Sequence, residues 1–445
     1  MNGSGWLVAL LLLLLVGGGV AFWIRGEGTP PVVEMAEVLL VGQNGLETPI
    51  DLSDPGSGLR SLRIAAGPAD AETVLLEESY PGNLLSGGMR KTHGVVVALA
   101  GPLLEKLSNQ STLRITARDW SWRGFFSGNE TALEIPVTVD LEPPRVQVSS
   151  GLTYVKQGGA GSVNYSVSEA VAADGVQVGE QRYRGHPVPG GTGERIALFA
   201  IPTDAPADVV PRVFAEDQAG NTATARWPVV VKPRVMPEGN VTLGASFLEN
   251  VVPRLTRVTA GADLKAAFHK VNTELRAANE ATIRERLVDT ASTPYFDGAL
   301  EQLANSQVTS RFAERRTYFV DGDPVSKATH FGFDLASTAA APITAAEAGR
   351  IVHAGELGIY GNCVLIDHGL GLGTLYGHLS RIDAQVGDEV AQGSTLGLSG
   401  ATGLAGGDHL HFAVLVGETY VDPLEWWDPK WVKTHVSPRL APQTP

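Results

Sequence analysis

HLHFAVLV, residues 409–416, is an apolar run that begins with two histidines two positions apart. Its short length and glycine-rich flanks predict a β-strand. Side chains alternate between the two faces of an extended strand, so His409 and His411 point the same way. Two imidazoles would then project side by side into one space. An interpretation as ordinary core histidines is poor, because each buried ring would need a polar partner within an apolar strand.

Three more residues of metal-binding type precede this strand. His330 and Asp334 occur in HFGFD, four positions apart, and share a face if the segment is extended. His378 lies among the apolar neighbours of another expected strand, TLYGHLS. Two imidazoles and one carboxylate suit a Zn²⁺ ion with one coordination position left open, and two further histidines remain for proton transfer. The five residues together predict a metal-dependent hydrolase.

In this order, HxGxD, YGHLS and HLHF resemble the M23 metallopeptidases, the lysostaphin and LytM type of peptidoglycan endopeptidase. The resemblance runs from about Thr317 to Trp431 and includes GIYGNCVLIDHG, VGDEVAQGSTLGLSGATG and VDPLEWW. One departure is Asp408, which stands where the family usually has Pro or Thr before HLH.

The resemblance implies a role for each residue of the constellation. It places His330, Asp334 and His411 on one Zn²⁺ ion per chain, and His378 and His409 around the metal-bound water. Either of the latter two could be the general base, and the sequence leaves that choice open. The implied fold of residues 317–432 is an antiparallel β-rich peptidase domain, followed by a tail at 433–445.

The composition limits the classes of protein that the chain can belong to. The net charge is −14, which argues against a nucleic-acid partner because little basic charge is left to neutralise phosphates. The single cysteine, Cys363, excludes an intrachain disulfide framework, and its apolar surroundings predict a buried strand residue. A chain of 445 residues is long enough for about two to four domains.

The N-terminus carries an uncharged apolar stretch from Trp6 to Ile24, with a tryptophan near each end. Its length and its ends predict a transmembrane anchor at residues 1–25. A cleaved secretory signal is the alternative, but no Lys or Arg precedes the stretch and no clean A-x-A site follows. Arg25, just after the stretch, would weakly favour a cytoplasmic location for the C-terminal end of the anchor. The expected function requires the opposite orientation, a single-pass inner-membrane protein with its catalytic domain in the periplasm or on the outer side.

Residues 32–143 and 144–235 read as two β-sandwich modules, since β-branched runs alternate with turn residues. An Ala-x-Asp…Gly-Asn pattern occurs once in each, around Asp119 and Asp217, and loosely resembles the Ig-like modules of bacterial surface proteins. Spacers are the preferred interpretation, although an envelope protein or a glycan could bind. The turn of the first module carries an aromatic tip that looks exposed and is expected to pack on a neighbouring module. This tip comprises Trp120, Trp122, Phe125 and Phe126.

The periodicity becomes helical in the linker region, residues 243–316, with Asp263 as the expected N-cap. This region could pack between the β modules and the peptidase domain, or it could cover the active-site groove. The apolar stripe of the expected helix contains Leu264, Phe268, Val271, Leu275, Ile283 and Leu287.

The leading hypothesis is a membrane-anchored zinc endopeptidase that acts on the peptide stems of peptidoglycan. A catalytically silent relative that activates another wall hydrolase is the second hypothesis, because fold alone does not fix function. A non-haem iron oxygenase is the third, since two histidines and a carboxylate also form an iron-binding triad.

Overall fold

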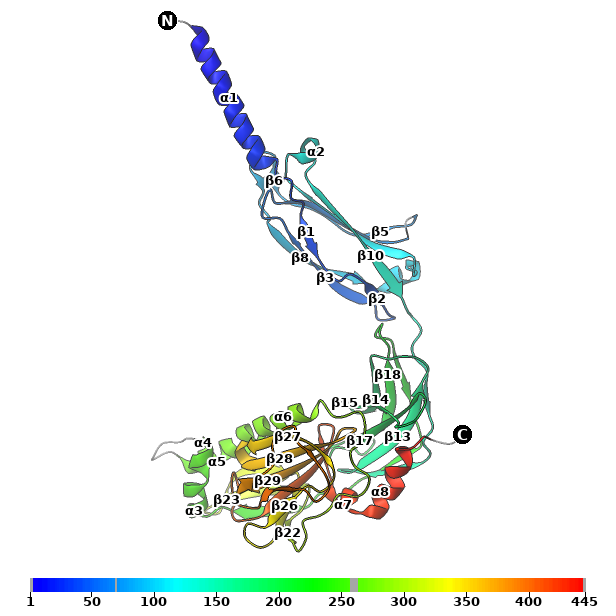
Figure 1. Ribbon diagram of the computed structural model, residues 1–445, viewed down its shortest axis with the longest axis vertical. Coiled ribbons are helices and arrows are strands. Elements are labelled where there is room, and N and C mark those ends of the chain that lie inside the picture. The colour runs from blue at the N-terminus through cyan, green and yellow to red at the C-terminus, as the bar shows by residue number, and fades with distance from the viewer. Residues whose placement is uncertain (1–2, 69, 257–262, 443–445) are drawn as a thin grey trace. The chain divides into compact units, whose positions relative to one another are not determined.

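The chain is a multidomain, mainly β protein, and its computed structural model describes residues 3–68, 70–256 and 263–442 (Figure 1). It divides into two compact units. The first comprises the residues up to Pro143 together with Glu216–Thr222, and the second comprises Pro144–Ala215 and the residues from Ala223 onward.

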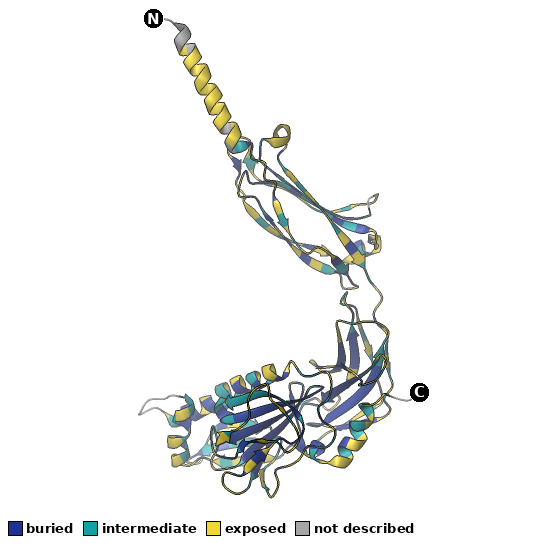
Figure 2. Ribbon diagram, in the orientation of Figure 1, coloured by how far each residue is buried: buried dark blue, intermediate teal, exposed yellow. Residues whose placement is uncertain are grey.

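The N-terminal apolar stretch forms helix α1 (Gly3–Arg25). Several of its side chains are exposed, including Leu13 at 71% and Trp23 at 82% (Figure 2). Across the residues that the structure describes, no helix combines the length and the apolar character required to cross a bilayer. This finding does not support the transmembrane anchor expected at residues 1–25.

The rest of the first unit is a sandwich of two sheets around a shared apolar core. Shorter elements in this unit are β6 (Gly82–Asn83), β7 (Gly87–Gly88), η1 (Gly101–Lys106) and α2 (Arg123–Phe126). One sheet contains β1 (Val32–Glu34), β3 (Leu46–Ser53) and β8 (Thr92–Leu99), and the other contains β2 (Leu39–Val41), β10 (Glu130–Val139), β9 (Ser111–Asp119), β4 (Leu59–Gly67) and β5 (Thr73–Ser79).

The repeated Asp…Gly-Asn pattern has a structural role in both copies. Asp119 accepts hydrogen bonds from the backbone N–H and the side-chain amide of Asn129, each at 2.7 Å. Asp217 accepts the same pair from Asn221, at 2.9 and 2.8 Å. Each buried aspartate therefore closes its turn by holding the asparagine that follows the glycine.

The aromatic tip packs partly on α1. The Trp122 ring lies 6.5 Å from the Phe22 ring, and its indole N–H donates to the carbonyl of Leu84 at 2.5 Å. Phe126 contacts Trp122 edge-on at 5.9 Å, whereas the Phe125 side chain is fully exposed. The neighbour that covers Trp122 is thus the N-terminal helix, where the sequence led us to expect a second module.

The second unit begins with a β-rich part that follows Pro144. It contains a parallel pair, β12 (Thr153–Lys156) with β20 (Val229–Lys232). Its two four-stranded sheets are formed by β11 (Val146–Val148), β13 (Ala160–Val167), β17 (Glu194–Ala200) and β16 (His186–Pro187), and by β15 (Gln181–Arg184), β14 (Ala173–Val178), β18 (Arg212–Glu216) and β19 (Thr222–Ala225).

This β-rich part packs directly on the C-terminal end of the chain. The Asn164 amide donates to the Arg439 carbonyl at 2.9 Å, and the Ser162 hydroxyl donates to the His435 carbonyl. Residues beyond 432, expected to be a tail, therefore belong to the packed structure as the end of α8 (Pro429–His435) and η4 (Ser437–Arg439). The reason is that they satisfy buried polar groups of β13.

Glu425 in α7 (Pro423–Trp427) makes this contact sensitive to pH. Its carboxylate accepts the Ala160 N–H at 2.9 Å, 3.9 Å from the Lys156 ammonium. Burial raises the pKa of Glu425 from 4.5 to about 7, although the Ala160 hydrogen bond and Lys156 oppose the increase. Between these two values the folded chain binds more protons than the unfolded chain, so its stability decreases as the pH rises and levels off above 7.

We expect Glu425→Gln to remove this pH dependence and to raise the free energy of unfolding at pH 8 by up to about 3 kcal/mol relative to wild type. Below pH 4.5 the two proteins should be nearly equal. Urea unfolding at pH 4.5 and pH 8 measures the difference. The expectation is wrong if the two free-energy curves stay parallel across this range.

The helical segment comprises α3 (Ala245–Asn250), α4 (Val252–Thr256), α5 (Leu264–Lys270), one π-helical turn, η2 (Val271–Leu275), and α6 (Arg276–Leu287). Asp263 is confirmed as the N-cap, since its carboxylate accepts the N–H groups of Lys265 and Ala266. Within the expected stripe, the buried members are Phe268, Val271, Ile283 and Leu287.

The helices end earlier than the expected boundary at residue 316. After Leu287 the chain leaves the helix, and Thr290 and Ala291 bind the Asp367 carboxylate at 2.6 and 2.9 Å. These bonds fix the chain to β28 (Asn362–Gly369), so the remaining stretch crosses the peptidase domain as a loop. It then forms β22 (Gln307–Ser310) and the start of β23 (Glu314–Val320).

The C-terminal domain is built on one large antiparallel sheet, and its central strands are buried (Figure 2). The order is β22, β25 (Phe333–Ala336), β33 (Leu410–Val416), β29 (Leu372–Leu379), β28, β27 (Gly349–Glu356) and β31 (Glu389–Val390), with β34 (Thr419–Val421) on β33. Cys363 is buried in β28, as predicted. Smaller sheets are β21 (Glu238–Thr242), β23 and β24 (Asp323–His330), and β26 (Pro342–Thr344), β32 (Thr395–Leu398) and β30 (Arg381–Ile382).

Candidate metal centre

Strand register brings the predicted ligands together. Asp334 on β25 pairs directly with His411 on β33, and Gly377 on β29 pairs with His411 from the other side. His330 ends β24. His378 follows Gly377 on β29. Asp334, His411 and Gly377 thus lie at one level of three neighbouring strands. His330, 81 positions before His411, reaches the same place from the end of β24, which belongs to another sheet.

The potential ligand atoms of His330, Asp334 and His411 form a close triangle. His330 Nε2 lies 2.9 Å from Asp334 Oδ1 and 3.0 Å from His411 Nδ1, and the last two atoms are 3.0 Å apart. Metal–ligand bonds of about 2.0–2.1 Å in a tetrahedral site place ligand atoms roughly 3.3 Å from one another. These three groups can therefore hold one metal ion and leave a fourth position open.

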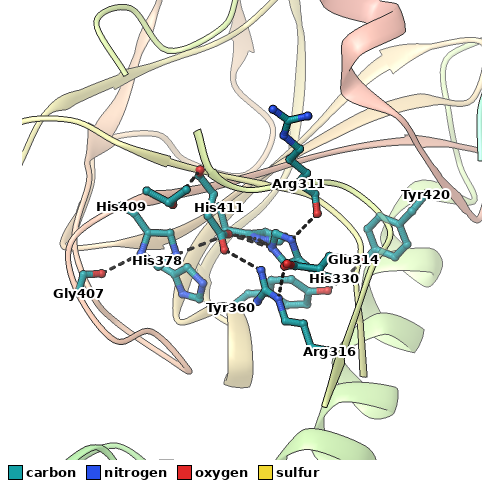
Figure 3. A network of polar contacts seen from close by, with 12 residues as sticks. Arg311, Glu314, Arg316, His330, Tyr360, His378, Gly407, His409, His411 and Tyr420 are labelled. Atoms are coloured by element: carbon teal, nitrogen blue, oxygen red, sulfur yellow. Dashed lines mark hydrogen bonds and ion pairs between the residues drawn. The ribbon is translucent and has the colours of Figure 1, made fainter. Parts of the chain in front are cut away.

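The orientation of three imidazoles is set by backbone carbonyls. The Nδ1 atoms of His330, His378 and His409 lie 3.1, 2.8 and 2.8 Å from the carbonyl oxygens of Arg311, Thr402 and Gly407 (Figure 3). A carbonyl can only accept, so each Nδ1 carries the proton. When such a ring is neutral, its lone pair lies on Nε2 and is available to a metal or a proton.

His411 is held differently, with Nδ1 in the ligand triangle and its opposite edge against Gly332. A Cβ atom at residue 332 would lie 2.6 Å from His411 Cε1 and 2.7 Å from Nε2. Glycine in HFGFD therefore leaves the space that the imidazole occupies. His411 Nε2 is buried, and none of the described residues forms a hydrogen bond with it.

His378 and His409 lie beside the triangle, with ring centroids 4.8 Å apart. His409 Nε2 is 3.6 Å from Asp334 Oδ1, outside the set of three ligand atoms. The His378 backbone adopts a left-handed conformation with φ of 65°. Such a conformation is strained for a residue with a side chain and is often found at functional sites.

The electrostatics of the site follow from burial and from a single carboxylate. Burial, and then the charges of His409 and His411, lowers the pKa of His378 to about 3. Burial also lowers the pKa of His411 to about 4. Burial alone would raise the pKa of Asp334, but the charge of His330 and three imidazole hydrogen bonds hold it well below its ordinary value. Asp334 is thus an anion, as a metal ligand must be.

The five residues face a cavity of about 380 Å³. Its apolar wall is contributed partly by the helical segment, through Phe247 of α3 and Phe268 of α5, and Arg276 of α6 lines it as well. The helical segment also packs on the peptidase domain, since α5 contacts β24 and α6 contacts β27. The helical segment therefore packs on the peptidase domain and also forms part of the cavity wall.

Sequence reasoning missed the charged residue that contacts the expected ligand Asp334. Arg316 on β23 lines the cavity and places its guanidinium 3.3 Å from Asp334 Oδ2. It lies 14 positions before His330, in a segment with no recognisable spacing, so only the pairing of β23 with β24 could have revealed it.

Comparison with known proteins agrees with this geometry. Residues 328–423 match the model of peptidase family M23. The chain is 35% identical over 122 residues to the peptidoglycan DD-endopeptidase ShyB of Vibrio cholerae serotype O1, covering 27% of this chain and 28% of that protein. It is 38% identical over 95 residues to the DD-carboxypeptidase/endopeptidase Mpg of Neisseria meningitidis serogroup B, covering 21% and 22%.

Among solved structures, the catalytic domain of the antimicrobial peptidase lysostaphin from Staphylococcus simulans is 28% identical, with a TM-score of 0.25, covering 29% of this chain and 98% of that one. The C-terminal part of the chain is therefore an M23 metallopeptidase domain. The chain spans only about a quarter of the length of the curated relatives that it matches.

Proposed function

We propose that the protein is a zinc metalloendopeptidase of the bacterial cell envelope that hydrolyses peptide cross-links of peptidoglycan. The observation that carries this proposal is the triangle of ligand atoms from His330, Asp334 and His411, open to a cavity that also receives His378 and His409. Two imidazoles and one carboxylate with an open position are the donor set of a hydrolytic zinc site.

The geometry supports a proposed role for each residue. When bound, zinc would lower the pKa of a water molecule to about 7 and polarise the scissile carbonyl. His378 and His409 both line the cavity and are held by backbone carbonyls at Nδ1, so Nε2 is the atom of each ring that can exchange a proton. A ring with a free lone pair on Nε2 can accept a proton from the attacking water and return it to the leaving amine, while the other ring, protonated at Nε2, can donate a hydrogen bond to the developing oxyanion.

The substrate class is inferred from the relatives, since ShyB is named a peptidoglycan DD-endopeptidase and Mpg a DD-carboxypeptidase/endopeptidase. Mass spectrometry of cross-linked muropeptides incubated with the full chain tests it. The expected result is loss of cross-linked dimers and one new free amine for each bond cut. Intact dimers in the presence of zinc-loaded protein would contradict catalysis and favour the second hypothesis, an activator of another wall hydrolase. Bound iron together with oxygen uptake would favour the third hypothesis, a non-haem iron oxygenase.

We further propose that α1 attaches the protein to the inner membrane and that the β-sandwich parts act as spacers toward the cell wall, with an envelope protein as a possible partner. The exposed apolar side chains of α1 support attachment, since such a surface is unfavourable in water. Membrane fractionation of a chain lacking residues 1–25 tests it. The proposal fails if the shortened protein stays with the membrane.

A further inference from the structure

Arg316 joins two carboxylates at the edge of the metal site (Figure 3). Its Nε donates to Glu314 at 2.7 Å, and its Nη2 donates to Asp334 Oδ2 at 3.3 Å. The Arg316 side chain is only 15% exposed. A largely enclosed guanidinium with two ion-pair partners is held in one orientation, because its planar fork fits both at once.

The contact divides the two oxygens of Asp334 between two tasks. Oδ1 faces the imidazoles of His330 and His411 at 2.9 and 3.0 Å, whereas Oδ2 faces Arg316. The terminal torsion of an aspartate is soft, so the carboxylate could otherwise rotate and offer either oxygen, or both, to a metal. The guanidinium removes this freedom.

We propose that Arg316 is a positioning residue that fixes Asp334 as a ligand through Oδ1 alone. The proposal rests on the proposed zinc site. A positive charge so close to a metal ion would by itself oppose metal binding, but Glu314 balances it at 2.7 Å. The orienting effect is therefore expected to outweigh the charge effect, and loss of Arg316 should weaken metal binding.

The test measures zinc affinity of the full chain by competition with a chromophoric chelator. Arg316→Ala should bind zinc roughly 10- to 100-fold more weakly than wild type, as for other groups that orient metal ligands. Arg315→Ala is the matched control, because Arg315 is the adjacent arginine on β23 and is exposed. Its zinc affinity should equal that of wild type.

Two further readouts separate positioning from substrate binding and from folding. Arg316→Lys keeps the charge without the fork and should give an intermediate zinc affinity. At saturating zinc, Arg316→Ala should recover most of its kcat with little change in KM. Thermal unfolding of the metal-free proteins checks the fold, and Arg316→Lys carries the comparison if the alanine variant is unfolded.

Unchanged zinc affinity in both Arg316 variants would overturn the proposal, and an increased KM alone would identify a substrate-binding residue. If wild type binds no zinc, the metal site itself is wrong and the positioning role falls with it.

Discussion

Replacing His411 by alanine is expected to abolish metal binding and peptidase activity together. His411 Nδ1 is one corner of a triangle whose other atoms lie 3.0 Å away, and the remaining two groups, His330 and Asp334, cannot complete a closed ligand set. We expect zinc content to fall from one per chain to near zero, with cleavage of cross-linked muropeptides at background. Metal analysis after gel filtration measures the first and mass spectrometry the second.

His353→Ala is the control for this substitution, because His353 is a partly buried histidine on β27 of the same sheet, outside the ligand group. It should keep full zinc content and activity. If His411→Ala retains stoichiometric zinc while losing activity, then His411 is no ligand and the assignment of the two histidines in HLHF is reversed.

His409→Ala is expected to separate metal binding from turnover. His409 Nε2 is 3.6 Å from Asp334 Oδ1 and does not belong to the ligand triangle, so zinc should stay bound. Loss of a proton-transfer or oxyanion-binding group typically costs about 10²- to 10⁴-fold in rate, and we expect kcat to fall by a factor in this range.

The measurement is kcat with a defined cross-linked dimer at saturating zinc, alongside the zinc content of the same sample. A structural role for His409 predicts something else, namely normal kcat with reduced thermal stability. That outcome would remove His409 from the proposed mechanism and leave His378 alone beside the metal.

The strands that carry the site could be predicted from sequence because their patterns are local. HLHFAVLV, TLYGHLS and CVLID are short apolar runs between glycine turns, and they form β33, β29 and β28. The helix that starts after Asp263 could also be predicted from sequence, since an N-cap residue and an apolar stripe of helical period are both local signals. The convergence of His330, Asp334 and His411 needed the resemblance as well, because spacing alone does not give strand register.

Features that depend on pairing between distant segments could not be predicted. Arg316 reaches Asp334 only because β23 pairs with β24 and so runs beside the site. Glu425 is buried against Ala160, 265 positions away, and nothing around PLEWW indicates that partner. The contribution of Phe247 and Phe268 to the cavity wall depends on how the helical segment docks, which an apolar stripe leaves open.

The most direct test of the account is X-ray absorption at the zinc edge on the purified full chain, combined with metal analysis. The account predicts one zinc per chain, with nitrogen and oxygen ligands at about 2.0–2.1 Å, two of them imidazoles, and loss of this signal in His411→Ala. A chain that binds no zinc, or a spectrum that is unchanged in His411→Ala, would contradict the claim that His330, Asp334 and His411 hold one catalytic metal ion.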